Sequence, residues 1–185
     1  MKETMRLLEN DMYGELVQTP LGPISFMVGP RGVQRLVFAP LTSFKETLPY
    51  QGNQPSWEGF HTIKKIIKEL NEYLEGRREN FSIMVDWLEM SDFQRRVLQV
   101  TCTVPYGELL TYGDIARQMG QPGAARAVGR ALGANPLPII IPCHRVIGSN
   151  HGLHGYLGGL ARKTFLLALE GHRIENHRVI YADVE

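Results

Sequence analysis

Two short helical patterns separated by a four-residue break restrict the fold of this chain more than any other feature. Residues 111–119 place Ile115 and Met119 four positions apart, as one buried face of a helix requires. Gly120-Gln121-Pro122-Gly123 ends that helix, and a second helix is predicted over residues 124–132. Two helices joined by a short turn form either a helix-turn-helix unit or an ordinary helical pair, and the spacing alone favours neither.

The second predicted helix consists mainly of small residues, from which two arginines project. Alanine and glycine over residues 124–131 permit close approach to a narrow groove, and a helix-turn-helix places its second helix in a DNA groove. We therefore expect Arg126 to enter a duplex and Arg130 to contact phosphate. The alternative is that both arginines are solvated helix charges.

The remaining pattern predicts an α+β chain that changes character near Trp87. Three β-prone runs separated by turn residues are typical of an antiparallel meander, namely residues 13–18, 24–28 and 33–38. A helix is predicted over residues 57–78, because apolar side chains recur at helical spacing at Phe60, Ile63, Ile67, Leu70 and Leu74. A further strand is expected at residues 81–85. Ser91 is a predicted N-cap, after which the chain should be mostly helical.

Composition narrows the classes to which the chain can belong. With 185 residues, 43% of them hydrophobic, it is long enough for one domain or two small ones. No apolar run reaches the roughly 18 residues of a membrane span, and residues 1–10 lack a signal-peptide core, so we expect a cytoplasmic protein with no membrane partner. Cys102 and Cys143 are the only cysteines, which argues against a disulfide framework and against a metal site.

Charge is distributed unevenly between the two halves. Residues 1–90 carry 10 Lys or Arg against 12 Asp or Glu, whereas residues 91–178 carry 10 against 5. All but Lys163 of the basic residues in the second segment are arginine, which suits bidentate contacts with phosphate and bases. A nucleic-acid partner is therefore favoured over a merely solvated surface, although only modestly.

The segment Ile141-Pro142-Cys143-His144-Arg145-Val146 predicts a reactive thiol. A cysteine is nucleophilic as thiolate, and a nearby base or positive charge promotes that form. The alternative is a buried apolar cysteine beside a surface histidine. Cys102 lies in the helix predicted after Ser91 and is expected to be structural.

Together these features resemble the O6-alkylguanine-DNA alkyltransferase family. The matching motifs occur in the family's order, as Thr111-Tyr112-Gly113, residues 125–129, Asn135-Pro136, residues 142–147, Gly155-Tyr156, Gly158-Gly159, Lys163, Leu166-Leu167 and Glu170-Gly171. Residues before about 91 resemble the family's variable N-terminal domain only loosely. The resemblance implies an N-terminal α+β, ribonuclease H-like domain over residues 1–88. It also implies a C-terminal helix-turn-helix, DNA-binding and alkyl-acceptor domain over residues 89–185.

The resemblance implies direct-reversal DNA repair by a methylated-DNA–protein-cysteine S-methyltransferase that acts once. An alkyl group would pass irreversibly from O6-alkylguanine to Cys143, with O4-alkylthymine as an alternative substrate class. No cofactor and no metal are expected. The expected partner is double-stranded DNA with alkylated bases, bound through its minor groove by a monomer.

Roles for single residues follow from the same resemblance. Cys143 is the acceptor, His144 its base acting through a water, and Glu170 the carboxylate that orients the imidazole. Asn135 braces the turn that presents Cys143, and Tyr112 contacts the flipped base and helps to neutralise the guanine leaving group.

The resemblance also implies a DNA surface and a base pocket. Arg126 would fill the gap left by the flipped nucleotide, within a DNA-binding set of Ala125, Arg126, Ala127, Gly129 and Arg130. The expected pocket comprises Leu132, Val146, Tyr156, Leu157 and Gly158. Leu157 departs from the Ser or Ala of many relatives, so a hydroxyl contact with the alkylated oxygen is absent. Lys163 is expected to be structural.

Two other functions use the same residues. A lesion-binding module would flip bases without chemistry, but such relatives replace the acceptor cysteine, and Cys143 argues against this function. A Cys-His-Glu amidase or protease would leave the helix-turn-helix and Arg126 unexplained.

Overall fold

The computed structural model describes residues 13–46, 57–88 and 90–181, with the side chains of residues 44–46 and 57–60 excepted. The chain divides into two compact units, Met1–Glu89 and Met90–Glu185. The predicted lack of a signal peptide at residues 1–10 concerns residues outside the described part. The α+β class predicted from the sequence is confirmed, with an antiparallel sheet in the first unit.

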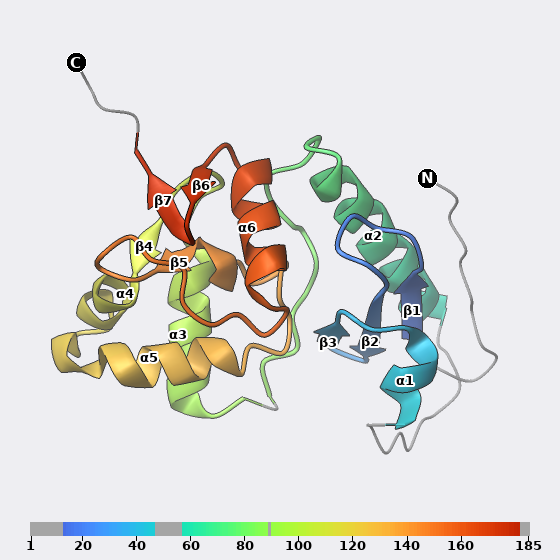
Figure 1. Ribbon diagram of the computed structural model, residues 1–185. Coiled ribbons are helices and arrows are strands. Elements are labelled where there is room, and N and C mark those ends of the chain that lie inside the picture. Colours follow the sequence, from blue (N-terminus) through green and yellow to red (C-terminus); the bar gives the residue numbers. More distant parts are fainter. Residues whose placement is uncertain (1–12, 47–56, 89, 182–185) are drawn as a thin grey trace. The chain divides into compact units, whose positions relative to one another are not determined.

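The first unit is built on a three-stranded antiparallel meander (Figure 1). Strands β1 (Tyr13–Leu16), β2 (Ile24–Gly29) and β3 (Gly32–Val37) pair in chain order. Helix α2 (Trp57–Leu74) packs on β1 and β2 through its buried face, formed by Ile63, Ile67, Leu70 and Leu74. Phe60 was also predicted to belong to this face, but its side chain lies outside the described part. Helix α1 (Leu41–Glu46) was not predicted, because a segment this short shows little periodicity.

The prediction of a strand at residues 81–85 is wrong. Only Val85 forms a bridge there, with Val33 of β3. The backbone of Ser82 is bound by side chains of α2 instead, since its N–H donates to Glu69 (2.8 Å) and its carbonyl accepts from Lys65 (2.6 Å). These bonds compete with the strand pairing that an alternating apolar pattern would otherwise favour.

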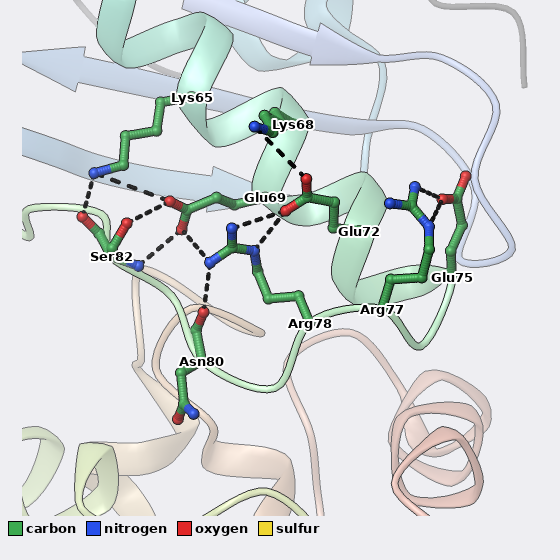
Figure 2. A network of polar contacts seen from close by, with 9 residues as sticks. All are labelled: Lys65, Lys68, Glu69, Glu72, Glu75, Arg77, Arg78, Asn80 and Ser82. Carbon is green, nitrogen blue, oxygen red and sulfur yellow. Dashed lines mark hydrogen bonds and ion pairs between the residues drawn. The ribbon is translucent and has the colours of Figure 1, made fainter.

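Glu69 is the buried centre of a polar network that attaches residues 77–82 to α2 (Figure 2). Its carboxylate accepts from the Ser82 hydroxyl (2.5 Å) as well as from the Ser82 N–H, and it lies 3.7 Å from Arg78 and 3.9 Å from Lys65. Only 3% of the Glu69 side chain is exposed. A buried carboxylate needs such partners to offset its lost hydration.

Over residues 90–181, the regular structure of the second unit is mostly helical, with four short strands. It contains α3 (Asp92–Cys102), β4 (Leu110–Thr111), α4 (Tyr112–Gln118), the 3-10 turn η1 (Pro122–Ala124), α5 (Ala125–Gly133), the 3-10 turn η2 (Cys143–Arg145), β5 (Val146–Ile147), α6 (Leu160–Leu169), β6 (Arg173–Glu175) and β7 (Arg178–Ile180). Ser91 caps α3, as predicted, by accepting from the Gln94 N–H. The four strands have only two or three residues each, too few to reveal an alternating pattern.

The two helices predicted around the Gly-Pro break are α4 and α5, and α3 packs against both (Figure 1). Thr111 begins α4 through a capping box with Asp114. Ile115 and Val128 are fully buried between the helices. In the part of the chain that the structure describes, no helix is both long and apolar enough to cross a membrane.

The polar network around Glu69 predicts a selective effect on the first unit. Glu69→Gln should lower the free energy of unfolding by about 1–3 kcal/mol, because the amide cannot accept from all the donors that the carboxylate binds. Both tryptophans, Trp57 and Trp87, belong to this unit, so urea unfolding followed by tryptophan fluorescence monitors it. Glu75→Gln, which removes an exposed pair with Arg77, is the control and should change stability by less than about 0.5 kcal/mol. Equal effects of the two variants would contradict this account.

Candidate functional site

A pair of parallel strands brings the segments that carry two of the sequence-predicted residues, Tyr112 and Cys143, together. Leu110 of β4 pairs with Val146 of β5, and Thr111 pairs with Ile147. Tyr112 follows β4 directly, while Cys143 begins the 3-10 turn η2 that leads into β5. The pairing therefore places the start of the helix-turn-helix beside the segment that carries the cysteine.

Asn135 holds the cysteine in place. Its Nδ2 donates to the Cys143 Sγ and to the Ile141 carbonyl, both at 3.0 Å, and its Oδ1 accepts from the Leu137 N–H at 3.0 Å. Between these contacts the backbone of Ile139 adopts a φ of 76°, which costs a β-branched residue about 1–3 kcal/mol. Asn135 and Ile139 are both buried, so their packing maintains the strained turn.

Cys143 is a protonated thiol in this environment. Burial raises its pKa to about 11, although the hydrogen bond from Asn135 and the charge of Lys163 act in the opposite direction. Lys163 is itself buried, and its Nζ donates to the Val146 carbonyl at 2.6 Å. Burial lowers the pKa of Lys163 to about 8. The lysine thus supports the segment next to Cys143 and contributes positive charge there.

A buried ion-pair cluster lies beside the thiol. The Nε2 of His144 is 2.9 Å from Oε1 of Glu170, and Arg145 donates to the same carboxylate through Nε (3.1 and 3.0 Å) and Nη2 (2.9 Å). Arg145 also donates through Nη1 to the Val104 carbonyl at 2.6 Å. At most 5% of each of these three side chains is exposed.

The cluster determines which atom of His144 can accept a proton. Burial lowers the pKa of His144, and although Glu170 raises it, the ring is neutral near neutral pH. The ionised Glu170 accepts a hydrogen bond from the Nε2–H of His144, which assigns the lone pair of the neutral ring to Nδ1. The base of this cluster is therefore Nδ1.

A cavity of about 1040 Å³ lies between the helix-turn-helix and the loop that follows β5. Six of the predicted site residues line it, namely Tyr112, Ala125, Arg126, Gly129, Tyr156 and Leu157. Burial raises the pKa of the Tyr112 phenol, and the nearby Cys143 raises it further. Tyr112 therefore keeps its proton at neutral pH.

Other predicted residues lie away from the lining of this cavity. Leu132 is a buried residue of α5, and Val146 is a buried residue of β5. The lining also excludes the buried residues Asn135, Cys143, His144 and Glu170, as well as Ala127, Arg130 and Gly158. Arg130 is exposed on α5, where it remains available to a partner.

Three residues of the site were not predicted from the sequence. Arg145 binds Glu170, and the loop residues Asn150 and His154 line the cavity. An arginine inside the apolar run from residue 137 to 147 signals a buried acidic partner, because an unpaired buried charge is costly. Within the described residues, no group of three or more His, Cys, Asp or Glu side chains is placed to hold a metal ion.

Comparisons with known proteins identify the family of the chain. Residues 92–172 match the family described as 6-O-methylguanine DNA methyltransferase, DNA binding domain. A methylated-DNA–protein-cysteine methyltransferase of Mycobacterium bovis is 52% identical over 158 residues, which is 85% of this chain and 91% of the relative. The homologue from Methanosarcina barkeri is 38% identical over 88% of this chain and 99% of its own length.

A solved structure extends the likeness to the fold. The crystal structure of Mycobacterium tuberculosis OGT in complex with DNA superposes with a TM-score of 0.70 at 38% identity, covering 86% of this chain and 92% of the other. The second unit thus has the DNA-binding domain of a 6-O-methylguanine DNA methyltransferase. The chain as a whole belongs to the methylated-DNA–protein-cysteine methyltransferase family, as its motifs predicted.

The buried thiol predicts an unusual pH dependence without DNA. In a Cys102→Ser background, labelling of Cys143 by a small thiosulfonate should rise about tenfold per pH unit from about pH 7 to about pH 10, because the thiolate fraction grows up to a pKa of about 11. Mass spectrometry measures the rate, and a short cysteine peptide, with a pKa near ~8.5, should reach its plateau earlier. A plateau for Cys143 below about pH 8.5 would contradict the prediction.

The same shift links stability to pH. The folded-state pKa is raised, so the thiol favours folding below its ordinary pKa, and this contribution is lost as pH rises through about 9 to about 11. The free energy of unfolding should therefore fall less between about pH 9 and about pH 11 in the Cys102→Ser, Cys143→Ser double variant than in Cys102→Ser alone.

Proposed function

We propose that this protein repairs alkylated DNA by direct reversal, moving the alkyl group from guanine O6 to Cys143. The observation that carries the proposal is a thiol positioned by Asn135 in the same short turn as His144, which is paired with the buried Glu170. The family assignment supports the reaction, since the curated relatives are methylated-DNA–protein-cysteine methyltransferases.

The reaction is an in-line displacement in which sulfur bonds to the alkyl carbon as the carbon–O6 bond breaks. His144 takes the thiol proton at Nδ1 through a bridging water, and Glu170 stabilises the resulting imidazolium. The bonding electrons leave with guanine, which receives a proton from Tyr112. Proton return from His144 to Tyr112 completes the balance, leaving guanine and a neutral thioether. A thioether has no easy hydrolytic exit, so each molecule acts once.

The substrate is double-stranded DNA that carries an alkylated base. The reacting carbon lies within the base stack, so the nucleotide must rotate out into the cavity, at a cost of a few kcal/mol. Arg126 is exposed at the cavity and would fill the gap in the duplex, while Arg130 would contact phosphate. The small residues Ala125, Ala127 and Gly129 suit close approach of α5 to the minor groove.

The base pocket would be walled by Tyr156 and Leu157, with Leu132, Val146 and Gly158 behind them. Leu157 is 59% exposed and apolar at the cavity, so it would restrict the size of the accepted alkyl group rather than bind its oxygen. O4-alkylthymine is proposed as a second substrate class. The chain would act in the cytoplasm as a monomer without a cofactor, and its N-terminal unit, proposed to be ribonuclease H-like over residues 1–88, contributes none of these groups.

The acceptor is identified by mass. Incubation with duplex containing O6-methylguanine should add one methyl group to the intact protein, on the peptide that contains Cys143. Cys143→Ser should abolish the transfer, whereas the matched variant Cys102→Ser should react like the wild type, because Cys102 lies in α3 rather than in the site. An unchanged mass of the wild type, or repair by Cys143→Ser, would refute the proposal.

A further inference from the structure

The C-terminal hairpin, formed by β6 and β7, packs against the loop of residues 148–154 that follows β5. The Val179 N–H donates to the His151 carbonyl (3.0 Å), and the Leu153 N–H donates to the His177 carbonyl (2.7 Å). The loop thus pairs with the hairpin much as a third strand would. The matched DNA-binding domain ends at residue 172, directly before this hairpin.

Side chains strengthen the same junction. Arg178 donates through Nη2 to the Asn150 carbonyl at 2.6 Å, and the ring of Tyr181 meets that of His151 edge-on with centroids 4.9 Å apart. Beneath them a buried apolar cluster joins the hairpin to β5, the loop and α6 through Val179, Ile147, Leu153 and Leu167. The loop is therefore held by backbone, polar and apolar contacts together.

The opposite side of the loop forms a wall of the cavity. Gly148, Asn150 and His154 line it, and the His154 ring lies 6.2 Å from the ring of Tyr112. The loop is tightly folded, since Asn150 Oδ1 accepts from the Gly152 N–H (3.1 Å), and a Cβ on Gly148 would lie 2.2 Å from Nε2 of His154. His151 has a φ of 61°, an uncommon conformation that needs support from its surroundings.

We infer that the hairpin positions this wall of the pocket for the reaction, and that Arg178 is a positioning residue acting through Asn150. The inference rests on the proposed function, because it assigns the cavity to the flipped base. A wall ordered in advance avoids the entropy that the loop would otherwise lose when the base enters. No described residue of the hairpin belongs to the lining of the cavity, so the hairpin acts on the geometry of the pocket and not on the substrate itself.

The hairpin supplies its own control. Arg173 lies on β6 and directs its Nη2 to Glu175 on the same strand (2.5 Å), whereas Arg178 reaches the loop. Substitution of either arginine by alanine removes one positive charge from the same hairpin. A nonspecific electrostatic effect on DNA binding should therefore be similar in both variants.

The test compares full-length Arg178→Ala, Arg178→Lys and Arg173→Ala with the wild type. Single-turnover methyl transfer is measured at saturating and at limiting O6-methylguanine duplex, and amide exchange at Leu153 and Val179 is measured without DNA. Arg178→Ala should slow transfer at saturating duplex about 3- to 10-fold, the size expected for one lost hydrogen bond, and should speed exchange at Leu153. Arg178→Lys, which can still donate to Asn150, should recover most of both, and Arg173→Ala should change neither.

Two results would overturn the inference. One is equal transfer rates for Arg178→Ala and Arg173→Ala at saturating duplex, even with faster exchange, because the hairpin would then be only structural. The other is unchanged exchange at Leu153 in Arg178→Ala. A wild-type protein that transfers no methyl group would instead refute the proposed function, and the exchange comparison would still decide whether Arg178 orders the loop.

Discussion

The second unit depends most on the contacts of the buried Glu170 carboxylate. Glu170 follows α6 and binds His144 and Arg145 of the turn η2, while Arg145 continues to the Val104 carbonyl beyond α3. Removing one partner from a buried pair of this kind costs about 3–5 kcal/mol, because the other charge is left without compensation. One carboxylate thus joins three segments distant in sequence, and it also fixes the protonated nitrogen of His144.

Stability and reactivity are combined in this arrangement. Burial keeps Cys143 protonated and His144 neutral, which are the states that avoid uncompensated charge in the folded protein. The same states hold the reactants of the proposed transfer, a thiol that loses a proton and a ring nitrogen that gains it. Asn135 and Lys163 favour the thiolate, so they offset part of the cost that burial imposes on its formation.

Local signals in the sequence predicted the features that depend on neighbouring residues. The Gly-Pro break predicted α4 and α5, Ser91 predicted the start of α3, and helical spacing predicted the buried face of α2. Features that depend on distant partners were not predicted from these local signals. The pairing of Arg145 with Glu170 spans 25 residues, and the strand expected at residues 81–85 was replaced by side-chain bonds from α2. The hairpin at the C-terminus depends on its contacts with the loop after β5, which no local pattern reveals.

Glu170 is proposed to act on the thiol through His144. A double-mutant cycle measures this directly, using single-turnover methyl-transfer rates of His144→Gln, Glu170→Gln and the double variant at saturating duplex, with folding verified for each. If the carboxylate works through the imidazole, the double variant should be no slower than His144→Gln alone. Losses in rate that multiply, so that the double variant is slower than either single variant by the full factor of the other, would contradict the account.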